Sequence, residues 1–232
     1  YDVFRLNLRD HGPSHHLNPE LFHSNRIHEV VGAVGHIQDL FPDRPLFLAG
    51  FSLGGNFALR VALRAPARAI RLRKVVAVCP VLEPANTLAA LESGWVTYRR
   101  YFLFKWRRSL RRKQEAFPEL YDFRDIRRYS TLTDLTAYFV EYYSGFASLE
   151  AYLKGYSLTG DALEPLEVPS HVILARDDPV IPAGDLARIA RPSCLDVTLT
   201  GDGGHCGYLE NLRLASWAER QIGGLFDSAG DA

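Results

Sequence analysis

Residues 45–55 read PLFLAGFSLGG, and this stretch decides the fold. A short apolar run over residues 45–51 leads into Gly-Phe-Ser-Leu-Gly, and a helix-forming sequence follows. A continuously apolar run of this length predicts a strand of a parallel sheet with both faces buried. A strand, a G-x-S-x-G turn and a helix in this order are typical of the tight turn that presents a nucleophilic serine at the edge of a sheet. Ser52 is therefore a candidate nucleophile.

Strands and helices are predicted to alternate along most of the chain. Apolar runs of strand length and segments with helical apolar spacing follow one another on both sides of Ser52. Such alternation is typical of βαβ units, in which helices connect parallel strands. We therefore expect an α/β fold with a mostly parallel sheet flanked by helices. Strands are predicted at residues 1–8, 45–51, 74–82, 171–175 and 194–200, and helices at residues 24–41 and 211–226.

Residues 88–165 interrupt this alternation. They contain no strongly apolar strand, and their helix-like segments are rich in aromatic residues and arginine. The simplest interpretation is a helical insertion over the edge of the sheet. We expect residues 1–87 and 166–232 to form the α/β core and residues 88–165 to form a helical cap.

The residues around Ser52 fit a sharp turn between strand and helix. Gly50 and Gly54 have no Cβ atom, so the strand and the helix can approach closely. The backbone N–H of Leu53 would point at the oxygen of a bound carbonyl, where the helix dipole favours negative charge. Because G-x-S-x-G also occurs by chance, the presence of a base and an acid must decide whether Ser52 is a nucleophile.

A serine nucleophile needs a histidine base, and only His171 and His205 follow Ser52 in the chain. His171 begins a predicted buried strand, which places it badly for a base carried by a loop. His205 lies in the Gly-rich stretch TGDGGHCGYLEN after the strand at 194–200. That loop should lie at the carboxyl edge of the sheet, as Ser52 does. His205 is therefore the candidate base.

The acid that orients this base is expected after the preceding strand. The strand HVILA runs into ARDDPVIP, which offers Asp177 and Asp178 at its carboxyl end. An Asp-Asp-Pro stretch can also be a solvated turn. With a serine turn before it and a glycine-flanked histidine after it, we favour Asp178 as the acid. Asp177 is the alternate acid or a group that caps the turn.

Six stretches across the chain carry a family resemblance: NLRDHG, SNRIHEVV, LAGFSLGGN, VAVCPVLEP, ARDDPVIP and GDGGHCGYLE. Together they resemble one branch of the α/β-hydrolase superfamily, the YheT-like esterases, which include the mammalian abhydrolase-domain lipases. By that resemblance Ser52, Asp178 and His205 form a catalytic triad, and the Leu53 N–H is one donor of an oxyanion hole. The family implies hydrolysis of carboxylic esters, and sometimes acyl transfer to an alcohol.

The resemblance also implies that N-terminal strands are missing from this sequence. In the family the NLRDHG strand is about the fourth of the sheet, and earlier strands carry a loop that supplies the second oxyanion donor. The chain begins with Tyr1 and contains no methionine, which agrees with this expectation. One further departure is Asp10, which stands in NLRDHG where the family often has glycine.

The composition excludes several classes of protein. With 27 basic and 27 acidic residues, nothing favours a nucleic-acid partner. Three cysteines without a CxxC pair argue against a disulfide framework and favour a reducing cytoplasm.

The abundance of Arg, Ala and Leu indicates a bacterial source. No apolar run approaches the length of a membrane span, and the histidines near the N-terminus match no zinc spacing.

Residues 95–113, WVTYRRYFLFKWRRSLRRK, predict a basic amphipathic helix. Such a helix can lie on an anionic membrane surface. Alternatively, it packs its aromatic side chains on a core and leaves a solvated basic face, which we favour. The apolar stripe would consist of Trp95, Tyr98, Phe102, Trp106 and Leu110, and the basic face of Arg100, Arg107, Arg108, Arg111 and Arg112.

We therefore expect a serine hydrolase that cleaves carboxylic esters through an acyl-enzyme. The substrate would be a small ester, with an apolar acyl group suggested by the aromatic cap. This chemistry requires no metal and no organic cofactor. Two alternatives stay open. One is acyl transfer to an alcohol by the same triad, and the other is a catalytically silent lipid-binding or membrane-surface module.

Overall fold

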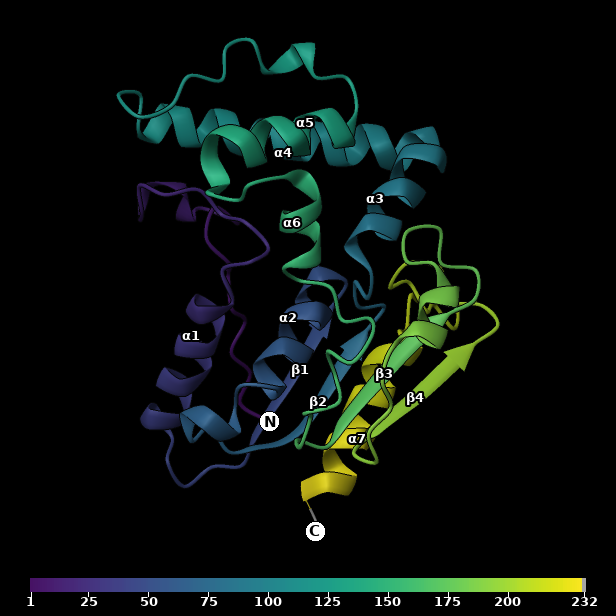
Figure 1. Cartoon of the computed structure of the whole chain (residues 1–232). Helices are drawn as coiled ribbons and strands as arrows, with labels where there is room; N and C mark the ends of the chain where they lie inside the picture. Colours follow the sequence, from purple (N-terminus) through teal and green to yellow (C-terminus); the bar gives the residue numbers. More distant parts are fainter. Residues whose placement is uncertain (231–232) are drawn as a thin grey trace. The chain divides into compact units, whose positions relative to one another are not determined.

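Four parallel strands form one sheet in the order β1-β2-β3-β4 (Figure 1). The computed structural model of the protein describes residues 1–230. Parallel strands require crossover connections, and the connection from β1 to β2 holds the helix that follows Ser52. The strands are β1 (Leu46–Phe51), β2 (Leu72–Val78), β3 (Ser170–Ala175) and β4 (Leu195–Thr200).

The chain groups into two compact units. The first comprises residues 1–26 and 91–155, and the second comprises residues 27–90 and 156–232. Residues 88–90 and 156–165, which the sequence places in a cap, thus belong to the unit that contains the sheet. The cap itself stays a prediction.

Three helices flank the sheet within the second unit: α1 (Ile27–Leu40), α2 (Leu53–Ala62) and α7 (Trp217–Gly230). Helix α2 packs on β1 and β2 and contacts α1, while α7 packs against β2 (Figure 1). Val75 to Val78 of β2 are fully buried, as expected for the apolar centre of a parallel sheet. The core of this unit therefore lies around β2, β3 and α2.

Strand β1, predicted at residues 45–51, is less buried than its apolar sequence indicates. Ala49 is exposed and Phe51 keeps 41% of its surface accessible, although both faces were expected to be buried. The reason is position in the sheet. Among residues 1–230, β1 pairs only with β2, so it is an edge strand and has fewer neighbours to cover its side chains.

The predicted strand at residues 1–8 is wrong. These residues have no regular secondary structure, and none of the sheet pairings among the described residues includes them. A strand is defined by hydrogen bonds to a neighbouring strand, so apolar sequence alone does not produce one.

The last helix begins at Trp217 and not near residue 211. The carboxamide oxygen of Asn211 accepts a hydrogen bond from the Arg213 N–H at 2.9 Å. Leu214 adopts a φ of 60°, which an α-helix does not allow. Asparagine side chains that bond to the nearby backbone compete with helix formation, so this segment forms a turn before α7.

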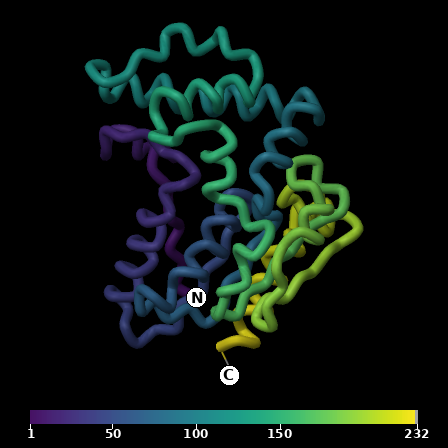
Figure 2. The backbone as a smooth tube through the Cα atoms, in the orientation of Figure 1, coloured from purple at the N-terminus to yellow at the C-terminus, as the bar shows by residue number. Residues whose placement is uncertain are grey.

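The first unit is mainly helical. Its longest helix, α4 (Val96–Ala116), is followed by a loop that runs back along it and into α5, as the backbone trace shows (Figure 2). No helix of the described chain is both long enough and apolar enough to cross a membrane. The other elements of the first unit are η1 (Ser14–His16), η3 (Ile126–Arg128), α5 (Leu132–Phe139), η4 (Val140–Ser144) and α6 (Leu149–Lys154). Helix α3 (Pro84–Ser93) is divided between the two units. The second unit also contains η2 (Pro66–Arg68) and η5 (Ala183–Arg188).

Helix α4 buries the predicted apolar stripe only in part. Leu110 is buried and Tyr98, Phe102 and Trp106 are half-buried, but Trp95 precedes the helix and is 72% exposed. Leu103 and Lys113 are also buried. The buried positions thus fall at 103, 110 and 113, which lie on one face of a helix. A lysine can occupy this face only because its ammonium group is fully paired.

Asp10 pairs with this buried lysine. Lys113 Nζ donates to Asp10 Oδ1 at 2.7 Å and to the carbonyl oxygens of His15 and Asn18 at 3.2 and 2.6 Å. The second carboxylate oxygen of Asp10 accepts from the Phe22 N–H at 2.8 Å. The unusual aspartate of NLRDHG therefore joins the N-terminal segment to α4 through a buried ion pair.

Candidate active site

Ser52 lies between the end of β1 and the start of α2, in a strained backbone conformation. Its φ and ψ are 53° and −121°, which a residue with a side chain rarely adopts. Its N–H donates to the Val78 carbonyl at 2.9 Å, and its own carbonyl accepts from the Asn56 N–H at 3.1 Å. Bonds to the neighbouring strand and to the helix thus hold the strained turn in place.

The glycines of this turn have different reasons to be glycine. A Cβ atom on Gly50 would overlap the backbone of Gly54, so the strand and the helix pass too closely for any side chain there. A Cβ atom on Gly55 would lie 3.1 Å from both the Gly50 carbonyl oxygen and Pro80. A Cβ atom on Gly54 would meet nothing within 4 Å. Close approach therefore explains Gly50 and Gly55 and not Gly54.

His205 bonds to Ser52 on one side and to Asp178 on the other. Its Nε2 lies 2.9 Å from Ser52 Oγ, and its Nδ1 lies 3.0 Å from Asp178 Oδ2 and 3.1 Å from Oδ1. The three side chains come from the ends of β1, β3 and β4, which meet at the carboxyl edge of the sheet. The structure thus brings together three residues that the sequence separates by 153 positions.

Asp178 is held in one orientation by the backbone that follows it. Its Oδ1 accepts hydrogen bonds from the N–H groups of Val180 and Ile181 at 2.8 and 2.9 Å. Its side chain is fully buried. These two hydrogen bonds fix the position of the carboxylate group. A carboxylate acceptor beside Nδ1 favours the proton on that nitrogen and leaves Nε2 free to accept one from serine.

The neighbouring Asp177 has a separate partner. Its Oδ1 accepts from the Gly204 N–H at 2.8 Å, in the backbone immediately before the histidine. Asp178 therefore contacts the imidazole ring, while Asp177 anchors the loop that carries it. His171 lies in β3, and its Nε2 contacts Thr198 Oγ1 at 2.7 Å. Its ring is thus engaged by the neighbouring strand β4.

The His205 loop is backed by Tyr208 and Trp217, which the sequence did not single out. Cys206 and Tyr208 have φ values of 62° and 46°. The Tyr208 ring stacks on Trp217 with centroids 5.5 Å apart, and its N–H donates to the Gly203 carbonyl at 3.0 Å. In the sequence, only the frequent glycines of TGDGGHCGYLEN indicated that this loop folds tightly.

Two thiols lie beside the histidine. Ligand atoms of Cys79, His205 and Cys206 all lie within 4.8 Å of one another, which is close enough for a metal ion. However, the two thiols donate to the carbonyl oxygens of Gly204 and Val78, each at 3.8 Å. The hydrogen bond with Cys79 and then burial raise the pKa of the Cys206 thiol, while the same hydrogen bond lowers the pKa of Cys79. Since metals bind the thiolate, the environment of Cys206 opposes a metal bound by both cysteines.

Leu53 is the first residue of helix α2. The first N–H groups of a helix have no partner within the helix, and they lie at the positive end of its dipole. A carbonyl oxygen bound next to Ser52 could therefore accept a hydrogen bond from the Leu53 N–H. With a serine, a histidine and a carboxylate in line, this arrangement can carry out nucleophilic acyl transfer.

The chain belongs to the alpha/beta hydrolase fold family, whose model matches residues 1–212. This places the four-stranded sheet and its helices in the fold that the sequence resembles. The chain spans about half the length of the curated relatives it matches.

Two relatives and one solved structure illustrate these similarities. The chain is 27% identical to monoacylglycerol lipase ABHD2 of Danio rerio, over 88% of this chain and 53% of that protein. It is 26% identical to the YheT protein of Escherichia coli (strain K12), over 87% of this chain and 61% of that protein. The crystal structure of serine hydrolase CCSP0084 from Cycloclasticus zankles matches 97% of this chain and 77% of its own, with a TM-score of 0.57 and 18% identity, which indicates a shared fold.

Proposed function

We propose that the protein is a serine hydrolase that cleaves carboxylic esters through Ser52, His205 and Asp178. The observation that carries this proposal is the continuous line of contacts from Ser52 Oγ through both ring nitrogens of His205 to Asp178, at 2.9 and 3.0 Å. Family membership supports hydrolysis, and the name of the lipase relative supports an ester substrate.

The first half of the reaction forms an acyl-enzyme. Ser52 Oγ attacks the ester carbonyl carbon while its proton passes to His205 Nε2. The carbonyl electrons move to the oxygen, where the Leu53 N–H stabilises the negative charge. When the tetrahedral intermediate collapses, the bond to the alkoxy group breaks. The leaving alcohol takes the proton from Nε2, and Ser52 keeps the acyl group.

The second half restores the enzyme. His205 Nε2 takes a proton from water, and the water oxygen attacks the acyl carbon. Collapse of the second intermediate breaks the bond to Ser52, which regains its proton from Nε2 as the carboxylic acid leaves. Asp178 keeps its charge throughout. It holds the Nδ1 proton and stabilises the imidazolium that forms in each half.

The substrate is proposed to be a small ester with an apolar acyl group. The lipase name of the Danio rerio relative supports this class. We also propose that the protein contacts a lipid surface through residues 95–113. Trp95, Tyr101 and Phe104 are each more than half exposed along this strongly basic segment. Exposed aromatic side chains among arginines are typical of helices that lie at a membrane interface.

A panel of p-nitrophenyl esters from acetate to laurate tests the proposed activity. We expect turnover that depends on acyl length and disappears in Ser52→Ala, with circular dichroism confirming that the variant is folded. Product analysis with added ethanol distinguishes hydrolysis from acyl transfer. A folded protein that turns over no ester, or a Ser52→Ala variant with full activity, would overturn the proposal. For the lipid contact, Trp95→Ala with Phe104→Ala should weaken co-sedimentation with anionic vesicles, and unchanged binding would contradict it.

A further inference from the structure

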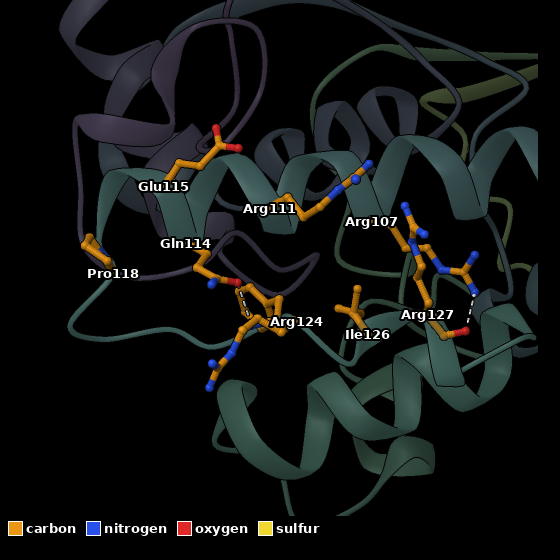
Figure 3. A pocket seen from close by; sticks show the side chains of 9 residues that line it. Arg107, Arg111, Gln114, Glu115, Pro118, Arg124, Ile126 and Arg127 are labelled. Atoms are coloured by element: carbon orange, nitrogen blue, oxygen red, sulfur yellow. Dashed lines mark hydrogen bonds between the residues drawn. The ribbon is translucent and has the colours of Figure 1, made fainter.

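A cavity of about 470 Å³ lies within the first, mainly helical unit, between α4 and the loop that follows it (Figure 3). This volume is in the range of small-molecule sites. Two buried apolar side chains, Phe123 and Ile126, form part of its wall. The rest is mostly charged. The lining consists of Arg107, Arg111, Gln114, Glu115, Pro118, Phe123, Arg124, Ile126 and Arg127.

The cavity has an excess of positive charge. Four arginines and one glutamate line it. Arg124 is paired with Asp122 at 2.6 Å, and its guanidinium lowers the pKa of that carboxyl to about 2. Among residues 1–230, no ion pair engages Arg107, Arg111 or Arg127, and Glu115 has no ion-pair partner. Three arginines without an ion-pair partner among the described residues therefore line one cavity, with a single carboxylate residue in the same lining.

Arg107 is held in place but keeps unused donors. Its Nη2 donates to the carbonyl oxygens of Tyr129 and Arg127, so the guanidinium is not on a solvated face as the helical wheel predicted. Its Nε is buried and has no hydrogen-bond partner within the described chain. The side chain of Arg127 lies beside it (Figure 3). Burying a charged donor without an acceptor is unfavourable, as is placing a second cation next to it.

We propose that this cavity binds the phosphate group of a small molecule between Arg107, Arg111 and Arg127. A dianion would supply acceptors for the unused donors and would offset the repulsion between the cations. The planar guanidinium fork matches the oxygens of a phosphate group and binds it through paired hydrogen bonds. Three cations around one cavity favour a doubly charged anion over a carboxylate. The site is independent of the Ser52 chemistry.

Calorimetric titration at fixed ionic strength tests this site. The probes are inorganic phosphate, glycerol 3-phosphate, soluble dihexanoyl phosphatidic acid and, as a monoanion, acetate. We expect saturable binding of one phosphate per chain and weaker binding of acetate. Arg111→Ala with Arg127→Ala should weaken phosphate binding at least about tenfold, since each charge-assisted hydrogen bond contributes about that factor. Both positions are exposed, so the variant should fold.

The matched control removes the same amount of charge from exposed positions outside the cavity. Arg100→Ala with Arg108→Ala alters two exposed arginines of α4 that do not line it, and we expect less than about a twofold change in the binding of inorganic phosphate, because exposed charges act weakly at a distance. Equal binding of glycerol 3-phosphate and the lipid supports a free phosphate group as the ligand, and preference for the lipid supports a headgroup. The proposal is wrong if no phosphate probe binds, or if both double variants weaken binding equally.

Discussion

The carbonyl oxygen of Gly54 occupies the space into which a Cβ atom on Gly50 would project. This close approach holds the end of β1 against the first turn of α2 and so positions Ser52 between them. We predict that Gly50→Ala lowers the free energy of unfolding by at least about 2 kcal/mol, because the backbone must shift to admit the methyl group. Urea denaturation followed by circular dichroism measures the change.

Gly54→Ala is the matched control for this prediction. A Cβ atom there meets nothing within 4 Å, and the residue lies in α2. The free energy of unfolding should therefore change by no more than about 1 kcal/mol, with alanine favoured as the better helix former. Equal destabilisation by both substitutions would contradict the difference between the two glycines.

The two adjacent aspartates are predicted to differ strongly in their effect on catalysis. Asp178 lies within hydrogen-bond distance of the His205 ring, and Asp177 accepts a hydrogen bond from the backbone N–H of Gly204. Asp178→Asn should lower kcat by about 10⁴, because the amide no longer favours the proton on Nδ1. Asp177→Asn keeps an oxygen acceptor for Gly204 and should cost far less. Steady-state kinetics on the best ester substrate decides between them, and a larger loss in Asp177→Asn would reverse the assignment.

The buried pair of Asp10 and Lys113 is predicted to stabilise the helical unit. Lys113 is fully buried, and its ammonium group has three oxygen acceptors. Lys113→Met leaves the Asp10 carboxylate buried without its cation, which should cost about 3–5 kcal/mol in unfolding free energy.

Adding Asp10→Asn to that variant removes the unpaired charge. The double variant should then be more stable than Lys113→Met alone, because a neutral amide is less costly to bury than a carboxylate. Thermal unfolding of the three proteins gives the comparison. A double variant that is the least stable of the three would contradict this account.

His171 is predicted to make stability depend on pH. Burial lowers the pKa of His171, and its Nδ1 is buried without a hydrogen-bond partner among residues 1–230. The unfolded chain therefore binds a proton more readily than the folded one. Stability should fall as the pH drops below the unfolded value of about 6.5, until the folded pKa is reached. His171→Gln should reduce this decline between neutral and mildly acidic pH, and an unchanged decline would show that other groups cause it.

The fold and the candidate site were predictable to different degrees. Strands β1 to β4 and the turn at Ser52 could be predicted because they follow from short-range sequence patterns. Proximity of Ser52 and His205 was also predictable, since the carboxyl ends of parallel strands share one edge. Whether Asp177 or Asp178 meets the ring was not, because that depends on loop geometry set by Val180, Ile181 and the backbone of Gly204.

The predictions for residues 1–8 and for α4 failed where the structure depends on contacts between residues far apart in the sequence. Residues 1–8 have the composition of a strand, but a strand also needs a hydrogen-bonded neighbour. The prediction for α4 missed Lys113, because this residue is buried through its pairing with Asp10, which lies 103 residues away. Helical periodicity carries no information about such a partner.

The most direct test of the central claim is labelling of the intact protein with a fluorophosphonate, followed by mass spectrometry to map the modified residue. Only an activated serine reacts readily with this probe. We predict a single adduct on Ser52 that is lost in Ser52→Ala and strongly reduced in His205→Ala. A folded protein with no adduct at Ser52, or one labelled as fast in His205→Ala as in the wild type, would contradict an activated nucleophile at this turn.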